Sequence, residues 1–128
     1  MPKLKSFDAT HFSFSVTPSK KILFANNKGQ KTYIKNRMDR MLSKEPETIK
    51  WINSFDKESV FFDIGANIGI YSLYSAIVKQ NLVYAFEPHA ASYKNLLESI
   101  NLNKLQNCNA HCIAMGDKLA LSSINIKN

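Results

Sequence analysis

The stretch VFFDIGANIGIY, residues Val60–Tyr71, decides the fold of this chain of 128 residues. Its first part, Val60–Ile64, is apolar apart from Asp63, which is typical of a parallel strand covered by helices on both faces. Gly65 and Gly69 allow a sharp turn and let a ligand approach the backbone closely. A helix that begins directly after the loop turns its free N–H groups toward the same place. A strand, a glycine loop and a helix, with a carboxylate at the end of the strand, predict a nucleotide or nucleoside site.

The spacing of the glycines narrows the kind of nucleotide. The loop reads Gly-x-x-x-Gly, and Asn67 stands where a dinucleotide fingerprint has its middle glycine. This disfavours NAD and FAD. The lysine and hydroxyl of a phosphate-binding P-loop are also absent from the stretch. The same spacing also suits a plain tight connection between a strand and a helix, and that interpretation stays open from the loop alone.

A second acidic residue follows the next predicted strand. Leu82–Phe86 is apolar and ends at Glu87 and Pro88, where proline lacks the N–H that would continue the strand. Glu87 lies about 20 residues beyond the glycine loop, where nucleotide-binding folds place an acid against the ribose hydroxyls. A carboxylate there can accept hydrogen bonds from both hydroxyls. The alternative is a solvated acid at the end of a strand.

Taken together, these motifs resemble the FkbM family of S-adenosylmethionine-dependent methyltransferases. The resemblance runs from about Glu45 to Asp117 and is carried by EPET with Trp51 and Ile52, by FDIGANIGIYS at residues 62–72, by FEP at residues 86–88, and by Leu97 with INLN at residues 100–103.

The resemblance implies a binding site for S-adenosylmethionine made by Asp63, Gly65, Ala66, Asn67, Gly69, Glu87 and Asp117. In such enzymes the glycine loop lines the methionine part of the cofactor, so that Asp63 would sit beneath it. Glu87 would hold the ribose. Asp117, which follows the third strand within Met115–Asp117, would face the amino group of the adenine.

The resemblance also implies an enzyme that methylates a hydroxyl of a sugar, a lipid or a secondary metabolite. The acceptor site and the general base are not visible in the sequence, so we expect a chain that carries the cofactor site but lacks a complete acceptor site. Two other classes stay open: a dinucleotide-binding half of an oxidoreductase, and a non-catalytic interaction module that keeps the fold.

The predicted fold is α/β. Residues 45–128 read as strand–helix–strand–helix–strand, with a third strand at residues 109–115 and a further extended piece at residues 119–126. This is part of a doubly wound, Rossmann-like parallel sheet in the strand order 3-2-1. The sheet is truncated, so the apolar strand at residues 60–62 is expected at an edge, where self-association or a partner would cover it.

Helices are predicted between these strands. One begins at Pro46 and carries an apolar stripe of Thr48, Trp51, Ile52 and Phe55 that should place Trp51 in the core. A second helix is expected over residues 68–79 and a third over residues 90–102, both from helical spacing of apolar residues.

Residues 1–44 are predicted to form a basic, β-rich extension. Alternation indicates strands at residues 12–16 and 21–25, and we expect a segment at residues 31–35 to pair back across a turn at residues 26–29. Residues 1–50 hold eleven Lys and Arg against four Asp and Glu, whereas the remainder is balanced, so the whole net charge of +7 lies here. The excess fits a solvated surface or an anionic partner. Nucleic acid is disfavoured, because no basic helix or aromatic platform is present.

The remaining composition is that of an ordinary globular protein, 45% hydrophobic and 21% charged. The sequence has no secretory signal and no apolar run long enough to cross a membrane, which favours a cytoplasmic protein. On one strand, Cys108 and Cys112 would lie about 13 Å apart, too far for a disulfide. His111 would face the opposite way, so no metal site is expected.

Overall fold

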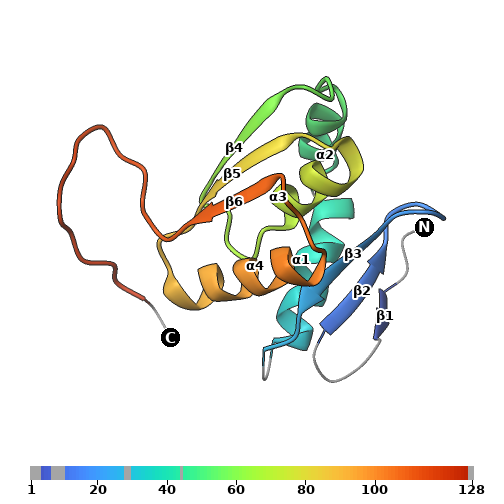
Figure 1. The fold of residues 1–128 in the computed structure, drawn as a ribbon. Helices are drawn as coiled ribbons and strands as arrows, with labels where there is room; N and C mark the ends of the chain where they lie inside the picture. Colours follow the sequence, from blue (N-terminus) through green and yellow to red (C-terminus); the bar gives the residue numbers. More distant parts are fainter. Residues whose placement is uncertain (1–3, 7–10, 28–29, 44, 127–128) are drawn as a thin grey trace.

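The computed structural model describes residues 4–6, 11–27, 30–43 and 45–126. It contains a parallel sheet and an antiparallel sheet, with helices packed against both (Figure 1). Helix α4 (Ala90–Leu102) contacts the antiparallel sheet and the parallel sheet and so joins the two. Part of the turn predicted at residues 26–29 lies outside the described residues.

The parallel sheet has the predicted strands and order. It consists of β4 (Val60–Ile64), β5 (Leu82–Phe86) and β6 (Cys108–His111), with β5 in the centre. Phe86 is in register with Ile64 on one side and with His111 on the other. The strand order is therefore 3-2-1, all three strands are parallel, and β4 lies at an edge of the described sheet.

The third strand is shorter than predicted. It ends at His111 and does not continue to residue 115. The last bond of this ladder runs from the Glu87 N–H to the His111 carbonyl oxygen, at 3.0 Å. Pro88 comes next and has no N–H to donate, so β6 loses its partner there.

Only one face of the parallel sheet is covered by the described residues. On that face Phe61, Val83 and Ala85 are buried. On the other face Phe62 and Ile64 of β4 are 59% and 64% exposed, and the rings of Phe62, Tyr84, Phe86 and His111 stack side by side. The expectation that helices cover both faces of this strand is therefore wrong for the described part of the chain.

The helices around the sheet are α2 (Pro46–Asn53), α3 (Ile70–Tyr74), a π-helical turn η1 (Ser75–Lys79) and α4. The start at Pro46 and the bounds of α4 confirm the predictions, whereas the helix expected from residue 68 begins two residues later. Trp51 does not lie in the core. It is 57% exposed and packs edge-on against Phe55, because Ile52, the next residue, is the one turned fully inward.

The amino-terminal part forms a three-stranded antiparallel sheet followed by a helix. Its strands are β1 (Leu4–Ser6), β2 (His11–Ser15) and β3 (Lys21–Ala25), in that order. Helix α1 (Lys31–Ser43) comes next, so the expected strand at residues 31–35 is wrong. Its buried residues Ile34, Met38 and Met41 are spaced for one face of a helix.

A row of polar side chains on α4 binds the free edge of β3, and we call this row the polar seam. Asn95 and Ser99 of α4 and its C-cap residue Asn103 are spaced four residues apart, which places them on one face of the helix. Asn103 accepts from the Leu23 N–H at 2.9 Å and donates to the Leu23 carbonyl at 2.7 Å. Ser99 accepts from the Ala25 N–H at 2.9 Å, and Asn95 donates to the Ala25 carbonyl at 3.0 Å. Side chains thus satisfy backbone groups that another strand would otherwise pair.

After β6 the chain leaves the sheet. Residues 112–126 form an irregular, exposed loop that projects away from the parallel sheet (Figure 1). The extended piece predicted at residues 119–126 pairs with no described strand, and Leu119 and Leu121 are fully exposed. No helix in the described ranges combines the length and the apolar character that crossing a bilayer requires.

Candidate functional site

The glycine loop between β4 and α3 has an unusual backbone. Gly65, Asn67 and Gly69 all have positive φ, at 78°, 55° and 82°. The N–H groups of Gly65 and Ala66 both donate to the Phe86 carbonyl, at 2.9 and 3.0 Å, and fasten the loop to the end of β5. A Cβ at Gly65 would meet nothing within 4 Å, so this backbone is open to an approaching molecule.

Glu87 and the glycine loop meet at the carboxyl end of the sheet. One carboxylate oxygen of Glu87 accepts the Asn67 N–H at 2.7 Å, and the other accepts the His89 N–H at 2.8 Å. Glu87 is only 8% exposed. Each oxygen of a carboxylate has two acceptor positions, so one remains on each oxygen of Glu87. The glycine loop that follows Asp63 and the acid that follows β5 therefore lie together, as their spacing in the sequence predicted.

Asp63 lies at the end of β4, half-buried beneath the loop. It accepts a hydrogen bond of 2.5 Å from the Ser72 hydroxyl. Burial raises the pKa of Asp63 above its ordinary value of 3.8, the bonds from Ser72 oppose that rise, and the negative charge of Glu87 adds to it. A buried carboxylate at a strand end attracts a cationic group that would offset its desolvation.

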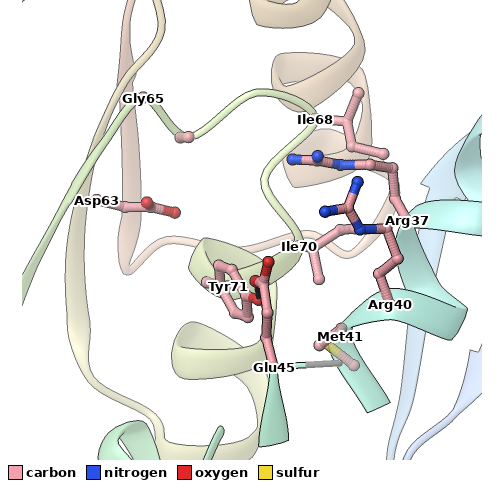
Figure 2. A pocket seen from close by; sticks show the side chains of 10 residues that line it. Arg37, Arg40, Met41, Glu45, Asp63, Gly65, Ile68, Ile70 and Tyr71 are labelled. Carbon is pink, nitrogen blue, oxygen red and sulfur yellow. Dashed lines mark hydrogen bonds between the residues drawn. The ribbon is translucent and has the colours of Figure 1, made fainter. Parts of the chain in front are cut away.

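A small pocket opens between Asp63, the glycine loop and α1. Its volume is about 60 Å³. Figure 2 shows Asp63 and Gly65 on one side and the guanidinium groups of Arg37 and Arg40 pointing toward them from the other. The lining is completed by Met41, Glu45, Ala66, Ile68, Ile70 and Tyr71.

Tyr71 lines this pocket without being an available base. Its hydroxyl donates to the Glu45 carboxylate. Burial, first, and then the hydrogen bond and negative charge of Glu45 raise the pKa of Tyr71 to about 12. Tyr71 is therefore neutral at pH 7. The pairing also ties α3 to the residue that precedes α2.

Asp117 is not brought to the site. It lies in the exposed loop of residues 112–126, and no described hydrogen bond links it to Glu87 or to the glycine loop. The neighbouring Met115 is 49% exposed. The role of Asp117 in binding the adenine therefore stays a prediction.

The contacts of His89 and the cysteines indicate roles in the fold. His89 is the residue before α4, and one of its ring nitrogens lies 3.0 Å from the Ser92 hydroxyl. Cys108 is buried in β6, whereas Cys112 lies beyond the strand and is exposed, and neither is in a disulfide. In the described ranges no three His, Cys, Asp or Glu side chains are grouped as a metal would require.

Sequence reasoning missed the contribution of α1 to this site. The Tyr33 hydroxyl lies 3.1 Å from the side-chain oxygen of Asn67 and 2.9 Å from its side-chain nitrogen. Arg37 and Arg40 line the pocket. These three residues are spaced i, i+4, i+7, which is one face of a helix. That spacing is the available signal, but residues 31–35 by themselves also fit a strand, which hides it.

Comparison with solved structures supports the fold. TYW2 from Pyrococcus horikoshii, solved in complex with MeSAdo, superposes with a TM-score of 0.54 at 19% sequence identity, over 85% of this chain and 38% of that one. TYW2 from M. jannaschii, solved in complex with AdoMet, gives a TM-score of 0.50 at 22% identity, over 84% of this chain and 45% of that one. This chain thus spans less than half the length of either structure.

No family model matches the chain, and no curated protein matches it. The resemblance to the FkbM family therefore depends on the motifs quoted above. The likeness to these structures is one of fold, and the chain shares the Rossmann-like α/β architecture with them.

Proposed function

We propose that this chain binds S-adenosylmethionine and is the donor-binding part of a methyltransferase related to the FkbM family. The observation that carries the proposal is the 2.7 Å hydrogen bond from the Asn67 N–H to Glu87, which joins the glycine loop and the second acid at one rim. Residues Asp63, Gly65, Ala66, Asn67, Gly69 and Glu87 are the proposed cofactor contacts. When bound, S-adenosylmethionine supplies an electrophilic methyl group.

The described residues fit such a ligand. The bare backbone at Gly65 leaves room for the methionine part, since a Cβ there would touch nothing within 4 Å. The free acceptor positions of Glu87 suit a pair of ribose hydroxyls. Following the motif resemblance, we propose a hydroxyl of a sugar, lipid or secondary metabolite as the acceptor, in the cytoplasm.

The direct test is calorimetric titration of the full chain with S-adenosylhomocysteine and, separately, with NADH. We expect saturable binding of S-adenosylhomocysteine and none of NADH. The reverse result would favour the half of a dinucleotide oxidoreductase. If neither ligand binds, a non-catalytic module that keeps the fold is the better description.

The role of Glu87 is better tested by changing the ligand than by changing the protein. Replacing Glu87 would remove the acceptor of two backbone N–H groups and would disturb the loop itself. We therefore compare 5′-methylthioadenosine with its 2′,3′-dideoxy analogue. Losing hydrogen bonds to a carboxylate should weaken binding about 10- to 100-fold. Equal affinity for the two nucleosides would contradict a ribose role for Glu87.

A further inference from the structure

Helix α1 presents a second row of side chains beside its buried face. Ile34 and Met38 are buried in the core, whereas Tyr33, Arg37 and Arg40 form the adjacent row. The hydrogen bonds between Tyr33 and Asn67 fix this row against the glycine loop. The two arginines are therefore held beside the site by the fold.

The arginines face the pocket without a counterion of their own. Within the described part of the chain, no hydrogen bond or ion pair engages the guanidinium group of Arg37 or Arg40. The nearby carboxylate of Glu45 accepts the Tyr71 hydroxyl. Arg37 is half-buried, and a cation removed from water is costly unless an anion joins it.

The charges on the two sides of the pocket are opposite. The guanidinium groups point in from α1, and the Asp63 carboxylate lies on the far side, beside Gly65 (Figure 2). A volume of about 60 Å³ is far below the roughly 300–1,000 Å³ of pockets that hold whole small-molecule ligands, so this pocket suits a small end group of the ligand. A carboxylate toward the arginines and an ammonium toward Asp63 would satisfy both sides.

Building on the proposed function, we propose that Arg37 and Arg40 bind the α-carboxylate of the methionine part of S-adenosylmethionine, opposite Asp63, which receives the α-ammonium group. Arginine suits this task because its planar group can donate two parallel hydrogen bonds to a carboxylate. An element outside the parallel sheet would then select for the amino-acid end of the ligand.

The test compares two ligands that differ at that end. S-adenosylhomocysteine carries the amino-acid group, whereas 5′-methylthioadenosine lacks it. We expect the full chain to bind S-adenosylhomocysteine at least about tenfold more tightly, given the strength of charge-assisted hydrogen bonds. Arg37→Gln and Arg40→Gln should each weaken S-adenosylhomocysteine about tenfold and leave 5′-methylthioadenosine within about twofold.

Two further variants make the test selective. Lys35→Gln removes the same charge from an exposed residue of α1 and should change neither affinity. Arg37→Lys keeps the charge but not the paired donors, so it should lower the affinity for S-adenosylhomocysteine by less than Arg37→Gln does. This variant keeps the test usable if Arg37→Gln folds poorly.

Each contrary result has a distinct meaning. The inference is overturned, and the proposed function stands, if the unaltered chain binds both nucleosides equally well. It is also overturned if the Gln variants weaken both ligands alike or weaken neither. Failure of the unaltered chain to bind either nucleoside overturns the proposed function and this inference with it.

Discussion

The hydroxyl of Tyr33 lies 3.1 Å from the side-chain oxygen of Asn67 and 2.9 Å from its nitrogen, so that α1 and the glycine loop are joined through one pair of side chains. Asn67 has φ of 55°, a conformation that an asparagine tolerates better than most residues. The contact therefore supports the loop where its backbone is least favourable.

Removing this hydroxyl should loosen the loop. Tyr33→Phe should lower the free energy of unfolding by about 0.5–1.5 kcal/mol, the usual net value of a hydrogen bond, and weaken S-adenosylhomocysteine several-fold. Urea unfolding and calorimetry measure the two effects. Tyr93→Phe is the matched control, because no described partner binds the Tyr93 hydroxyl. Equal behaviour of the two variants would argue against a role for the contact.

The two glycines of the loop should respond differently to alanine. At Gly69 an added Cβ would lie 2.2 Å from Leu96 Cδ1, and φ is 82°. Gly69→Ala should therefore cost about 1–3 kcal/mol of backbone strain and a further cost of about 1–3 kcal/mol from overpacking. Gly65→Ala meets open space, so only strain should remain. Chemical denaturation measures the stability of both variants. A Gly65→Ala variant less stable than Gly69→Ala would contradict the prediction.

Asp63 should make stability depend on pH. Because burial raises its pKa in the folded chain, the folded state holds this proton more tightly than the unfolded state does. The stabilisation is complete below pH 3.8 and is lost as pH rises through the raised pKa. As pH rises from 3.8 through the raised pKa, the Asp63→Asn variant should therefore become more stable relative to the unaltered chain. It should keep this advantage at pH 7.

Unfolding curves at several pH values measure this difference. Asp39→Asn, which changes an exposed carboxylate of α1, is the control. Parallel pH profiles for Asp63→Asn and the unaltered chain would show that ionising Asp63 costs nothing in the folded state. The same variant should weaken S-adenosylhomocysteine, since the proposed partner of its ammonium group loses its charge.

The two thiols should differ in reactivity. Burial, followed by the negative charge of Asp63, raises the pKa of Cys108 to about 12, whereas Cys112 is exposed. With a disulfide reagent such as Ellman's reagent at pH 8, Cys112 should react quickly and Cys108 only after unfolding. In Cys112→Ser the fast phase should disappear. Fast reaction of both thiols in the native chain would mean that β6 is not packed as described.

The sequence predicted those parts of the fold in which local pattern and packing agree. Val60–Ile64 and Leu82–Phe86 are short apolar runs, one with an acid at its penultimate position and the other followed by an acid, and both are strands with the predicted bounds. The sequence also predicted that Glu87 lies close to the glycine loop, because the carboxyl ends of neighbouring parallel strands share one edge of a sheet.

The parts that failed depend on neighbours that a local pattern does not show. The third strand stops at His111 because Pro88, which follows the neighbouring strand β5, has no N–H to pair with it. Trp51 is exposed because Ile52 occupies the inward direction of α2. The arginines of the pocket were missed because residues 31–35 fit a strand as well as a helix, and only a helix that continues to Ser43 places Tyr33, Arg37 and Arg40 on one face.

The polar seam has a consequence for the order in which the chain can fold. Strand β3 finds the partners for its outer edge on α4, 70–80 residues later in the sequence. At a synthesis rate of roughly 5–20 residues per second, the first sheet must wait several seconds on the ribosome for those amide and hydroxyl groups to emerge. Until then its outer edge is open to pairing with other extended chains, which makes this interval a time of aggregation risk.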